Sequence, residues 1–171
     1  VFDTDELMRL RDKVATVYKS GYAGDTQIPV RVLTDHIRTL TFAMSDGIYP
    51  SNESRGYVLR RVLRRAMLFG RKLGQRDPML YQLVDEVISI YGKFYPELND
   101  NAEFVKNFIR EEEARFLRTL ESGANKLEEI MVGAKEKAAG LISGADAFQL
   151  YDTFGFPLEM TRELAEQNAL T

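Results

Sequence analysis

The chain has 171 residues, enough for one domain with a sizeable core or for two small helical subdomains, and its 44% hydrophobic content is typical of a soluble globular protein. It has no cysteine, which excludes disulfides and thiolate–metal sites and favours a cytoplasmic protein, and no apolar run approaches the roughly 20 residues that cross a bilayer. The net charge of −3, taken over the whole chain, argues against nucleic-acid binding.

Apolar residues recur with the period of a helix along most of the chain, and no segment alternates like a β-strand. The sequence therefore predicts an all-α, multi-helix domain with one long amphipathic helix. Two packed helical subdomains, divided near residues 92–100, are the alternative to a single domain. The expected helices span residues 3–20, 29–45, 55–74, 77–92, 101–131, 145–152 and 158 onward, with a Gly155-Phe156-Pro157 turn before the last.

The helix expected at residues 55–74 is strongly basic. Residues 54–76 contain no acid and eight Lys or Arg residues, so the rest of the chain has a net charge of −11. On a helical wheel the apolar residues from Val58 to Leu73, apart from Leu68, fill about half the circumference. The opposite arc, here called the basic face, consists of Arg60, Arg61, Arg64, Arg65, Arg71 and Lys72. Either acidic helices elsewhere pair with this face or a polyanion does, and arginine favours phosphate because its planar fork binds it bidentately.

Two polar residues lie on turns in the predicted fold. Asn52 follows Pro50 and Ser51 just ahead of the basic helix, a setting typical of turn or cap residues. Asp152 lies where a short helix meets a turn, a setting typical of a cap or turn acceptor. Composition and periodicity do not connect the two residues.

No catalytic constellation is evident from the residue types. The single histidine, His36, lies on a mostly apolar helix and is expected to be a hydrogen-bonded structural residue. The acidic run at residues 111–113 is expected to be a solvated helix face. Residues 21–24 lack the lysine and the strand–helix context of a phosphate-binding loop.

Four blocks of the sequence resemble the alanyl-tRNA synthetase family, in its order and at about its spacing. They are RVLTDHIR at 31–38, SDGIYPSNESRGYVLRRVLRRA at 45–66, EEEARFLRTL at 111–120 and LYDTFGFPLEMT at 150–161. The resemblance implies the helical domain that follows the class II catalytic core, binds the tRNA(Ala) acceptor stem and recognises a G·U wobble pair from the minor groove. It implies that Asn52 and Asp152 contact this pair and that Arg64 contacts the backbone beside it. Arg60, Arg61 and Arg65 are expected on neighbouring phosphates.

The resemblance also implies a larger parent protein, an alanine–tRNA ligase with catalytic and editing domains. The chain begins at Val1 rather than at a methionine and stops within a helical pattern, so we expect a segment of that longer protein. The parent is expected to use ATP with magnesium, and zinc in its editing domain. The ATP-binding arginine motifs and the histidine- and cysteine-rich zinc site are absent from this sequence, so the segment is expected to be inactive alone and to bind no cofactor.

Two other functions fit the residues. A helical interaction module could bind an acidic protein surface through the basic face. A structural connector could hold the catalytic and editing domains of the parent apart. Binding to RNA predicts a steep fall in affinity with salt and a preference for A-form duplex, whereas a connector predicts no binding.

Overall fold

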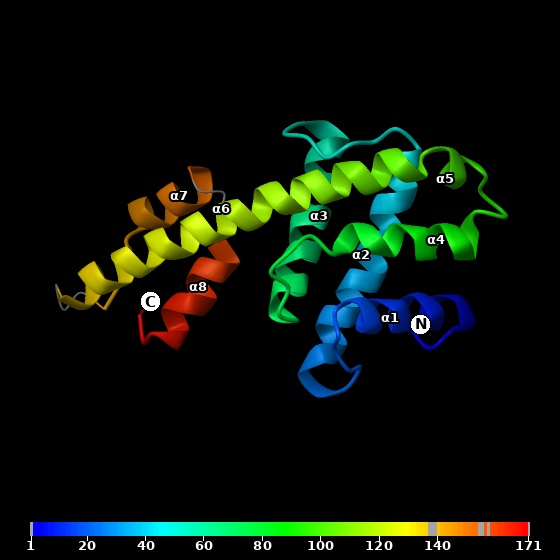
Figure 1. Ribbon diagram of the computed structural model, residues 1–171. Coiled ribbons are helices and arrows are strands. Elements are labelled where there is room, and N and C mark those ends of the chain that lie inside the picture. Colours follow the sequence, from blue (N-terminus) through cyan, green and yellow to red (C-terminus); the bar gives the residue numbers. More distant parts are fainter. Residues whose placement is uncertain (1, 137–139, 154–155, 157, 171) are drawn as a thin grey trace. The chain divides into compact units, whose positions relative to one another are not determined.

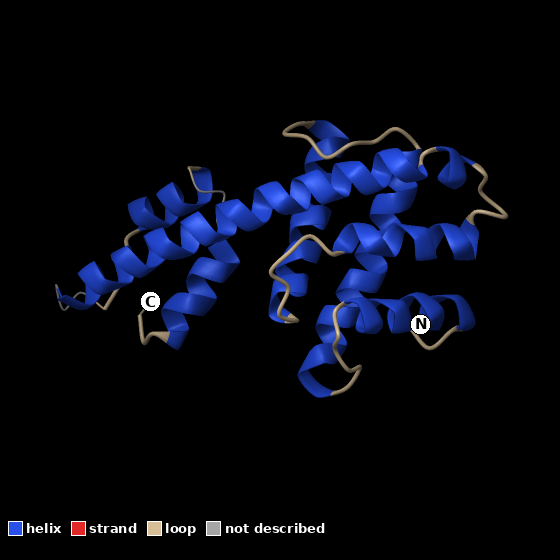
Figure 2. Cartoon of the chain, viewed as in Figure 1, coloured by secondary structure: helices blue, strands red, loops and turns tan. Residues whose placement is uncertain are grey.

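Helices are the only regular secondary structure in the computed structural model, which describes residues 2–136, 140–153, 156 and 158–170 (Figures 1 and 2). The prediction of an all-α fold is therefore confirmed over these residues. The helices are α1 (Asp5–Val17), η1 (Gly24–Thr26), α2 (Gln27–Ser45), α3 (Ser54–Lys72), η2 (Leu80–Leu83), α4 (Val84–Tyr91), α5 (Glu97–Asp100), α6 (Ala102–Glu136), α7 (Gly144–Asp152) and α8 (Leu158–Gln167), of which η1 and η2 are 3₁₀ helices. The predicted turn at residues 155–157 lies largely outside the described residues.

Two element boundaries differ from those that the sequence predicts. The Asp77-Pro78 pair does not start a helix. A 3₁₀ helix begins at Leu80, and the α-helix follows only at Val84. The long helix α6 continues past residue 131 through Gly133 to Glu136. One glycine in a helix costs only about 1 kcal/mol, so it weakens a long helix without ending it.

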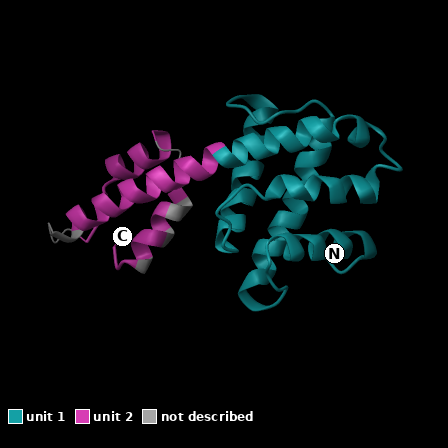
Figure 3. Cartoon of the chain, in the orientation of Figure 1, with its two compact units in different colours: residues 1–114 teal, residues 115–171 magenta. Residues whose placement is uncertain are grey.

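The chain divides into two compact units, Val1–Ala114 and Arg115–Thr171 (Figure 3). The division lies inside helix α6, whereas the alternative of two helical subdomains places it near residues 92–100. The glycine and proline there mark the short connections around α5, which belong to unit 1. A loop with proline and glycine interrupts the backbone, but only the packing of side chains decides which helices share a core.

The core of unit 1 is built around helix α2, which contacts α1, α3 and α4. Leu33, Ile37, Leu40 and Met44 recur at three- and four-residue spacings along one side of α2 and have no exposed surface. Residues of this size contribute about 1.5–3 kcal/mol each when fully buried. The basic helix α3 packs on α2 through a stripe that includes Leu63, so its outer side is held at a fixed position on the unit.

The core of unit 2 contains Phe156, whose side chain is fully buried. The backbone N–H of Phe156 donates to the carbonyl oxygen of Leu150 at 2.9 Å, which anchors the chain after helix α7. A Cβ atom added to Gly123 of helix α6 would lie 2.6 Å from the ring of Phe156. The ring of Phe156 therefore packs against α6 in the space that the missing side chain of Gly123 leaves.

Replacing Gly123 with alanine is expected to destabilise unit 2 by about 1–3 kcal/mol, because the added methyl overpacks the core against Phe156. Gly133→Ala on the same helix is the matched control, since its Cβ would meet nothing within 4 Å. The control should stabilise the helix by up to about 1 kcal/mol. Thermal unfolding followed by circular dichroism measures both, and equal shifts of the two variants would contradict this account of Gly123.

Within the described part of the chain, no helix has the length and apolar character needed to span a membrane.

Candidate nucleic-acid interface

The basic face lies on the outer side of helix α3. Leu59, Leu63, Ala66 and Met67 are buried, while Arg61 and Arg65 on the opposite side are exposed. The helical wheel predicts this division, with one exception. Val58 is expected on the apolar side, but 62% of its surface is exposed, because it lies at the edge of the apolar arc, away from the buried Leu59 and Leu63.

The arginines of the basic face differ in how deeply they lie. Arg60 and Arg64 are half-buried at the edges of the face, and Arg71 donates from Nη1 to the carbonyl oxygen of Gln75 at 3.0 Å. The guanidinium of Arg65 lies 5.8 Å from the ring centroid of Phe69 on the same helix. Arg65 and Arg71 are therefore held by contacts within α3 and the turn that follows it.

The sequence leaves two partners open for the basic face, acidic helices of the same chain or an external polyanion. Among the described residues, no carboxylate forms an ion pair with Arg60, Arg61 or Arg65. The acidic residues of unit 1 instead pair elsewhere, as in Glu86 with Arg9 at 2.7 Å and Asp85 with Lys106 at 3.1 Å. At these three positions the charge is available to a ligand.

Asn52 lies at the tip of a tight turn that leads into α3. The backbone N–H of Ser51 donates to the carbonyl oxygen of Gly56 at 3.0 Å, and the Ser51 hydroxyl donates to the carbonyl oxygen of Glu53 at 3.0 Å. A Cβ on Gly56 would lie 2.5 Å from the carbonyl oxygen of Tyr49, so the turn closes tightly only over a glycine. Ser54 has φ of +49°, a left-handed conformation that a serine adopts only under constraint.

The side chain of Asn52 is exposed and has no hydrogen bond to any described residue. Its surroundings predict a turn or cap residue, and the turn is confirmed. The hydrogen bond within the turn is made by Ser51, which accepts at Oγ from the N–H of Glu53 at 3.3 Å. The amide of Asn52 therefore remains free, on a turn that is itself fixed, to donate and accept hydrogen bonds.

Asp152 is the last residue of helix α7 in unit 2, and its side chain is exposed. No described residue pairs with its carboxylate. A negative charge at the C-terminal end of a helix is unfavourable, because the helix dipole is negative there. The sequence predicts a cap or turn acceptor at this position, and among the described residues Asp152 makes no such contact.

The structure thus places Asn52 and the basic face together at the start and along the outside of α3, in unit 1. Asp152 lies in unit 2, and its pairing with Asn52 stays a prediction. No group of three or more potential metal ligands occurs among the described residues.

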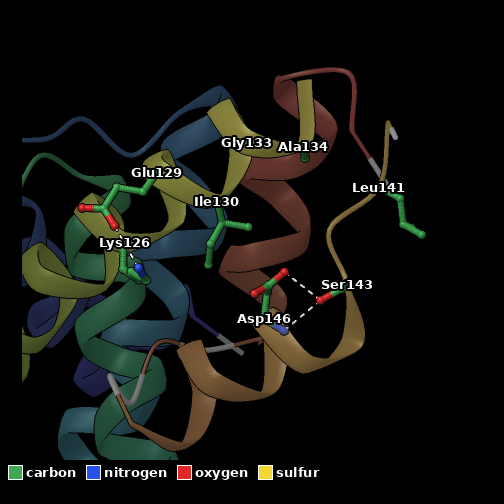
Figure 4. A pocket seen from close by; sticks show the side chains of 8 residues that line it. All are labelled: Lys126, Glu129, Ile130, Gly133, Ala134, Leu141, Ser143 and Asp146. Carbon is green, nitrogen blue, oxygen red and sulfur yellow. Dashed lines mark hydrogen bonds and ion pairs between the residues drawn. The ribbon is translucent and has the colours of Figure 1, made fainter. Parts of the chain in front are cut away.

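A shallow pocket in unit 2 is lined by the end of helix α6 and the start of α7 (Figure 4). Lys126 pairs there with Glu129 at 2.9 Å, and the Ser143 hydroxyl donates to Asp146 at 2.7 Å. Ser143 also accepts from the backbone N–H of Asp146 at 3.1 Å, as an N-cap of α7. These polar groups of the described pocket lining therefore bond to one another.

Glu113 differs from what the sequence predicts. It belongs to a run expected on a solvated helix face, yet its side chain is fully buried. It accepts hydrogen bonds from Gln75 Nε2 at 2.7 Å and from the backbone N–H groups of Leu80, Met79 and Tyr81 at 2.9, 3.1 and 3.2 Å. Burial raises the pKa of Glu113 above its ordinary value, although these donors act in the opposite direction. The spacing from Val105 and Ile109 on the buried side of α6 is the signal that could have identified it.

His36 is half-buried on helix α2, as expected for a structural histidine. Its Nδ1 lies 3.2 Å from Oδ2 of Asp35, and its Nε2 has no hydrogen-bond partner among the described residues. Burial lowers the pKa of His36, and the charge of Arg65 lowers it further, while Asp35 acts in the opposite direction. The neutral imidazole is therefore the form that the fold favours.

The pH dependence of His36 follows from this shift. Because its folded pKa is lowered, the stability that the neutral imidazole contributes is present above 6.5, the ordinary pKa, and is lost as pH falls through the folded pKa. The chain has one histidine, so an NMR titration of the imidazole should give a single pKa below 6.5. The stability difference between the parent chain and His36→Asn should shrink with acidification; a pKa of 6.5 or above would contradict the assignment.

A family model described as tRNA synthetases class II (A) matches residues 1–171. The chain therefore belongs to this family. Its relatives within the family are alanine–tRNA ligases: it is 48% identical to that of Desulforamulus reducens, 47% to that of Streptococcus sanguinis and 46% to that of Exiguobacterium sibiricum. Each match covers 99% of this chain and 20% of the relative, so the chain spans one fifth of the length of these proteins. The resemblance to alanyl-tRNA synthetases is confirmed.

Proposed function

We propose that this chain is the part of an alanine–tRNA ligase that binds the acceptor stem of tRNA(Ala) and recognises its G·U wobble pair from the minor groove. The observation that supports this most directly is the side of α3 on which Arg60, Arg61 and Arg65 have no ion pair among the described residues, with the free amide of Asn52 at the start of the same helix. Phosphate contacts would provide affinity and Asn52 would contact the base edges.

The chemistry of the wobble pair suits the two proposed contact residues. The minor groove of A-form RNA is wide and shallow, so side chains can contact base edges and 2′-hydroxyl groups there. Guanine presents its N2 amino donor in this groove, and in a wobble pair that donor has lost its usual partner. The Asp152 carboxylate can only accept a hydrogen bond, while the Asn52 amide can both donate and accept.

The test compares stem duplexes with G·U and with G·C at the same position, titrated against the chain at two salt concentrations. The parent chain should prefer G·U, and Asn52→Ala and Asp152→Ala should each reduce that preference by about 1–3 kcal/mol, or roughly five- to 150-fold. Asn107→Ala and Asp100→Ala, at exposed positions on α6 and α5, are matched controls that should leave it unchanged. Wild-type preference in both test variants would contradict the proposal.

Attachment of alanine to tRNA would be performed by the rest of the parent protein, with ATP and magnesium at its catalytic core and zinc in its editing domain. We expect the 171-residue chain alone to form no alanyl-tRNA in a single-turnover assay with ATP, alanine and tRNA. As part of a translation enzyme it would act in the cytoplasm, in contact with the catalytic and editing domains of the parent.

The two alternatives make different predictions in the same titration. A module for an acidic protein surface would show no preference for A-form over B-form duplex, and a connector would show no measurable binding. The absence of an ion pair at Arg61 and Arg65 among the described residues favours binding of a polyanion over the connector function. Cations on one helix face repel one another when no ligand neutralises them.

A further inference from the structure

Tyr57 is an exposed tyrosine on the same side of helix α3 as the basic face. Arg60, Arg61 and Arg64 follow it by three, four and seven residues, the spacings at which side chains share one side of a helix. The side chain of Tyr57 is 42% exposed, and it forms no hydrogen bond, ring contact or cation–π contact with another described residue. An aromatic ring with a free hydroxyl therefore lies among the arginines.

The other tyrosines of unit 1 each have a place in the fold. Two rings lie against an arginine guanidinium, at 4.3 Å from the ring centroid for Tyr22 and 5.6 Å for Tyr81. Tyr18 is buried. Three more rings pack on phenylalanine rings at centroid distances of 5.1 to 5.4 Å: Tyr49, Tyr91 and Tyr95. Among the described tyrosines of this unit, Tyr57 is thus the one whose side chain the fold does not use.

Backbone hydrogen bonds hold Tyr57 beside the turn that bears Asn52. The N–H of Tyr57 donates to the carbonyl oxygen of Glu53 at 3.0 Å, and the N–H of Ser51 donates to the carbonyl oxygen of Gly56 at 3.0 Å. These two bonds close residues 51–57 on themselves. Along the axis of α3, Tyr57 therefore comes directly after the Asn52 turn, and the arginines of the basic face begin about 4.5 Å further on, since each residue of a helix adds 1.5 Å.

The parts of a nucleotide follow one another in the matching order. The ribose joins the base to the phosphate, so a side chain between a base-contacting residue and phosphate-contacting residues is placed to meet the sugar. In the minor groove of A-form RNA the ribose 2′-hydroxyls lie beside the base edges. A 2′-hydroxyl and a tyrosine hydroxyl each donate and accept hydrogen bonds, so each can satisfy the other. DNA lacks this group, and a contact with it separates the two nucleic acids.

We propose that Tyr57 is a specificity-determining residue, whose hydroxyl forms a hydrogen bond with a ribose 2′-hydroxyl in the minor groove of the bound stem. Asn52 addresses the base edges and the arginines address the phosphates, while Tyr57 distinguishes RNA from DNA. The inference rests on the proposed function, because contacts of Asn52 with bases and of the arginines with phosphates are what bring a ribose to Tyr57.

The test titrates the chain with RNA stem duplexes in which one nucleotide at a time is replaced by its 2′-deoxy form. At the nucleotide that Tyr57 contacts, the replacement should weaken binding to the parent chain roughly two- to tenfold, as expected for one lost hydrogen bond. Tyr57→Phe should bind the all-RNA duplex more weakly by the same factor and lose nothing more at that nucleotide, because the bond is already absent. Its salt dependence should stay that of the parent, since tyrosine is uncharged.

Tyr95→Phe is the matched control, because Tyr95 is also exposed and belongs to unit 1 but lies outside α3; it should bind every duplex as the parent does. If Tyr57→Phe bound the all-RNA duplex as tightly as the parent, or lost further affinity at every nucleotide where the parent does, the hydroxyl would contact no ribose and the inference would be overturned.

The same series is run on stems with G·U and with G·C, which separates this inference from the proposed function. A ribose contact of Tyr57 in a chain that binds both stems equally would support the role of Tyr57 and overturn the recognition of the wobble pair. A preference for G·U without that contact would do the reverse, and a parent chain that bound neither stem would overturn both.

Discussion

Replacing Glu113 by alanine is expected to lower the free energy of unfolding of unit 1 by about 3–5 kcal/mol, among the largest effects for a single substitution in this chain. The main cost arises because four donors, the side-chain amide of Gln75 and the N–H groups of Met79, Leu80 and Tyr81, are left without their acceptor inside the core. Each buried donor left unsatisfied costs about 1–3 kcal/mol, and entry of water would recover part of that.

Urea denaturation followed by tyrosine fluorescence measures this effect, since the chain has no tryptophan and seven of its eight tyrosines lie in residues 1–114. Glu111→Ala is the matched control on the same helix and should change stability by no more than about 0.5 kcal/mol, because its side chain is exposed. A destabilisation below about 1 kcal/mol for Glu113→Ala would mean that its four donors find other partners.

The comparison of Glu111 with Glu113 shows where sequence reasoning stops. A run of glutamates on a helix is normally solvated, so residue type alone places all three in water. Periodicity contains the opposite information, because Glu113 continues the buried series of Val105 and Ile109 four residues further on. What the sequence could not provide is the set of donors from residues 75–81, which lie more than 30 residues before Glu113 in the chain and reach it only through tertiary packing.

The fold class and most helices were predictable because helical periodicity and breaking residues are local signals. The prediction failed where tertiary contacts override them. The N–H groups of residues 79–81 donate to Glu113, and the α-helix expected from Pro78 begins only at Val84, after the 3₁₀ helix η2. Gly133 does not end α6, which continues to Glu136.

Part of the candidate site could likewise be predicted from the sequence, and part could not. The basic face could be derived from charge and helical period alone, since the absence of acids between residues 54 and 76 is visible in the sequence. That the Asn52 amide has no partner in the turn could not be derived, because it depends on Ser51 making the side-chain hydrogen bonds of that turn. The family resemblance is what connects Asn52 with Asp152, and the pairing of these residues in two different units stays a prediction.

Substitution of Arg61 and Arg65 by glutamine is expected to weaken binding to an acceptor-stem duplex on the order of 100-fold at low salt, about tenfold for each arginine–phosphate interaction that the substitution removes. Both side chains are exposed on the basic face, and no described carboxylate pairs with either. The slope of log affinity against log salt concentration should fall by about two, or about one per phosphate. The ratio of G·U to G·C affinity should not change, because phosphate contacts hold the duplex without reporting its sequence.

The same double substitution that weakens RNA binding should not destabilise the protein. Arg61 and Arg65 are four residues apart on one helix, where like charges repel by about 0.2–0.5 kcal/mol, so their neutralisation should leave α3 equally or slightly more stable. Lys13→Gln with Lys93→Gln is the matched control, since it removes two charges from exposed positions of the same unit outside α3. Salt-dependent titration separates the two double variants. If the control lost as much affinity as the Arg61 and Arg65 variant, net charge rather than the basic face would attract the RNA. If neither variant lost affinity, the charge on α3 would serve a partner other than a polyanion.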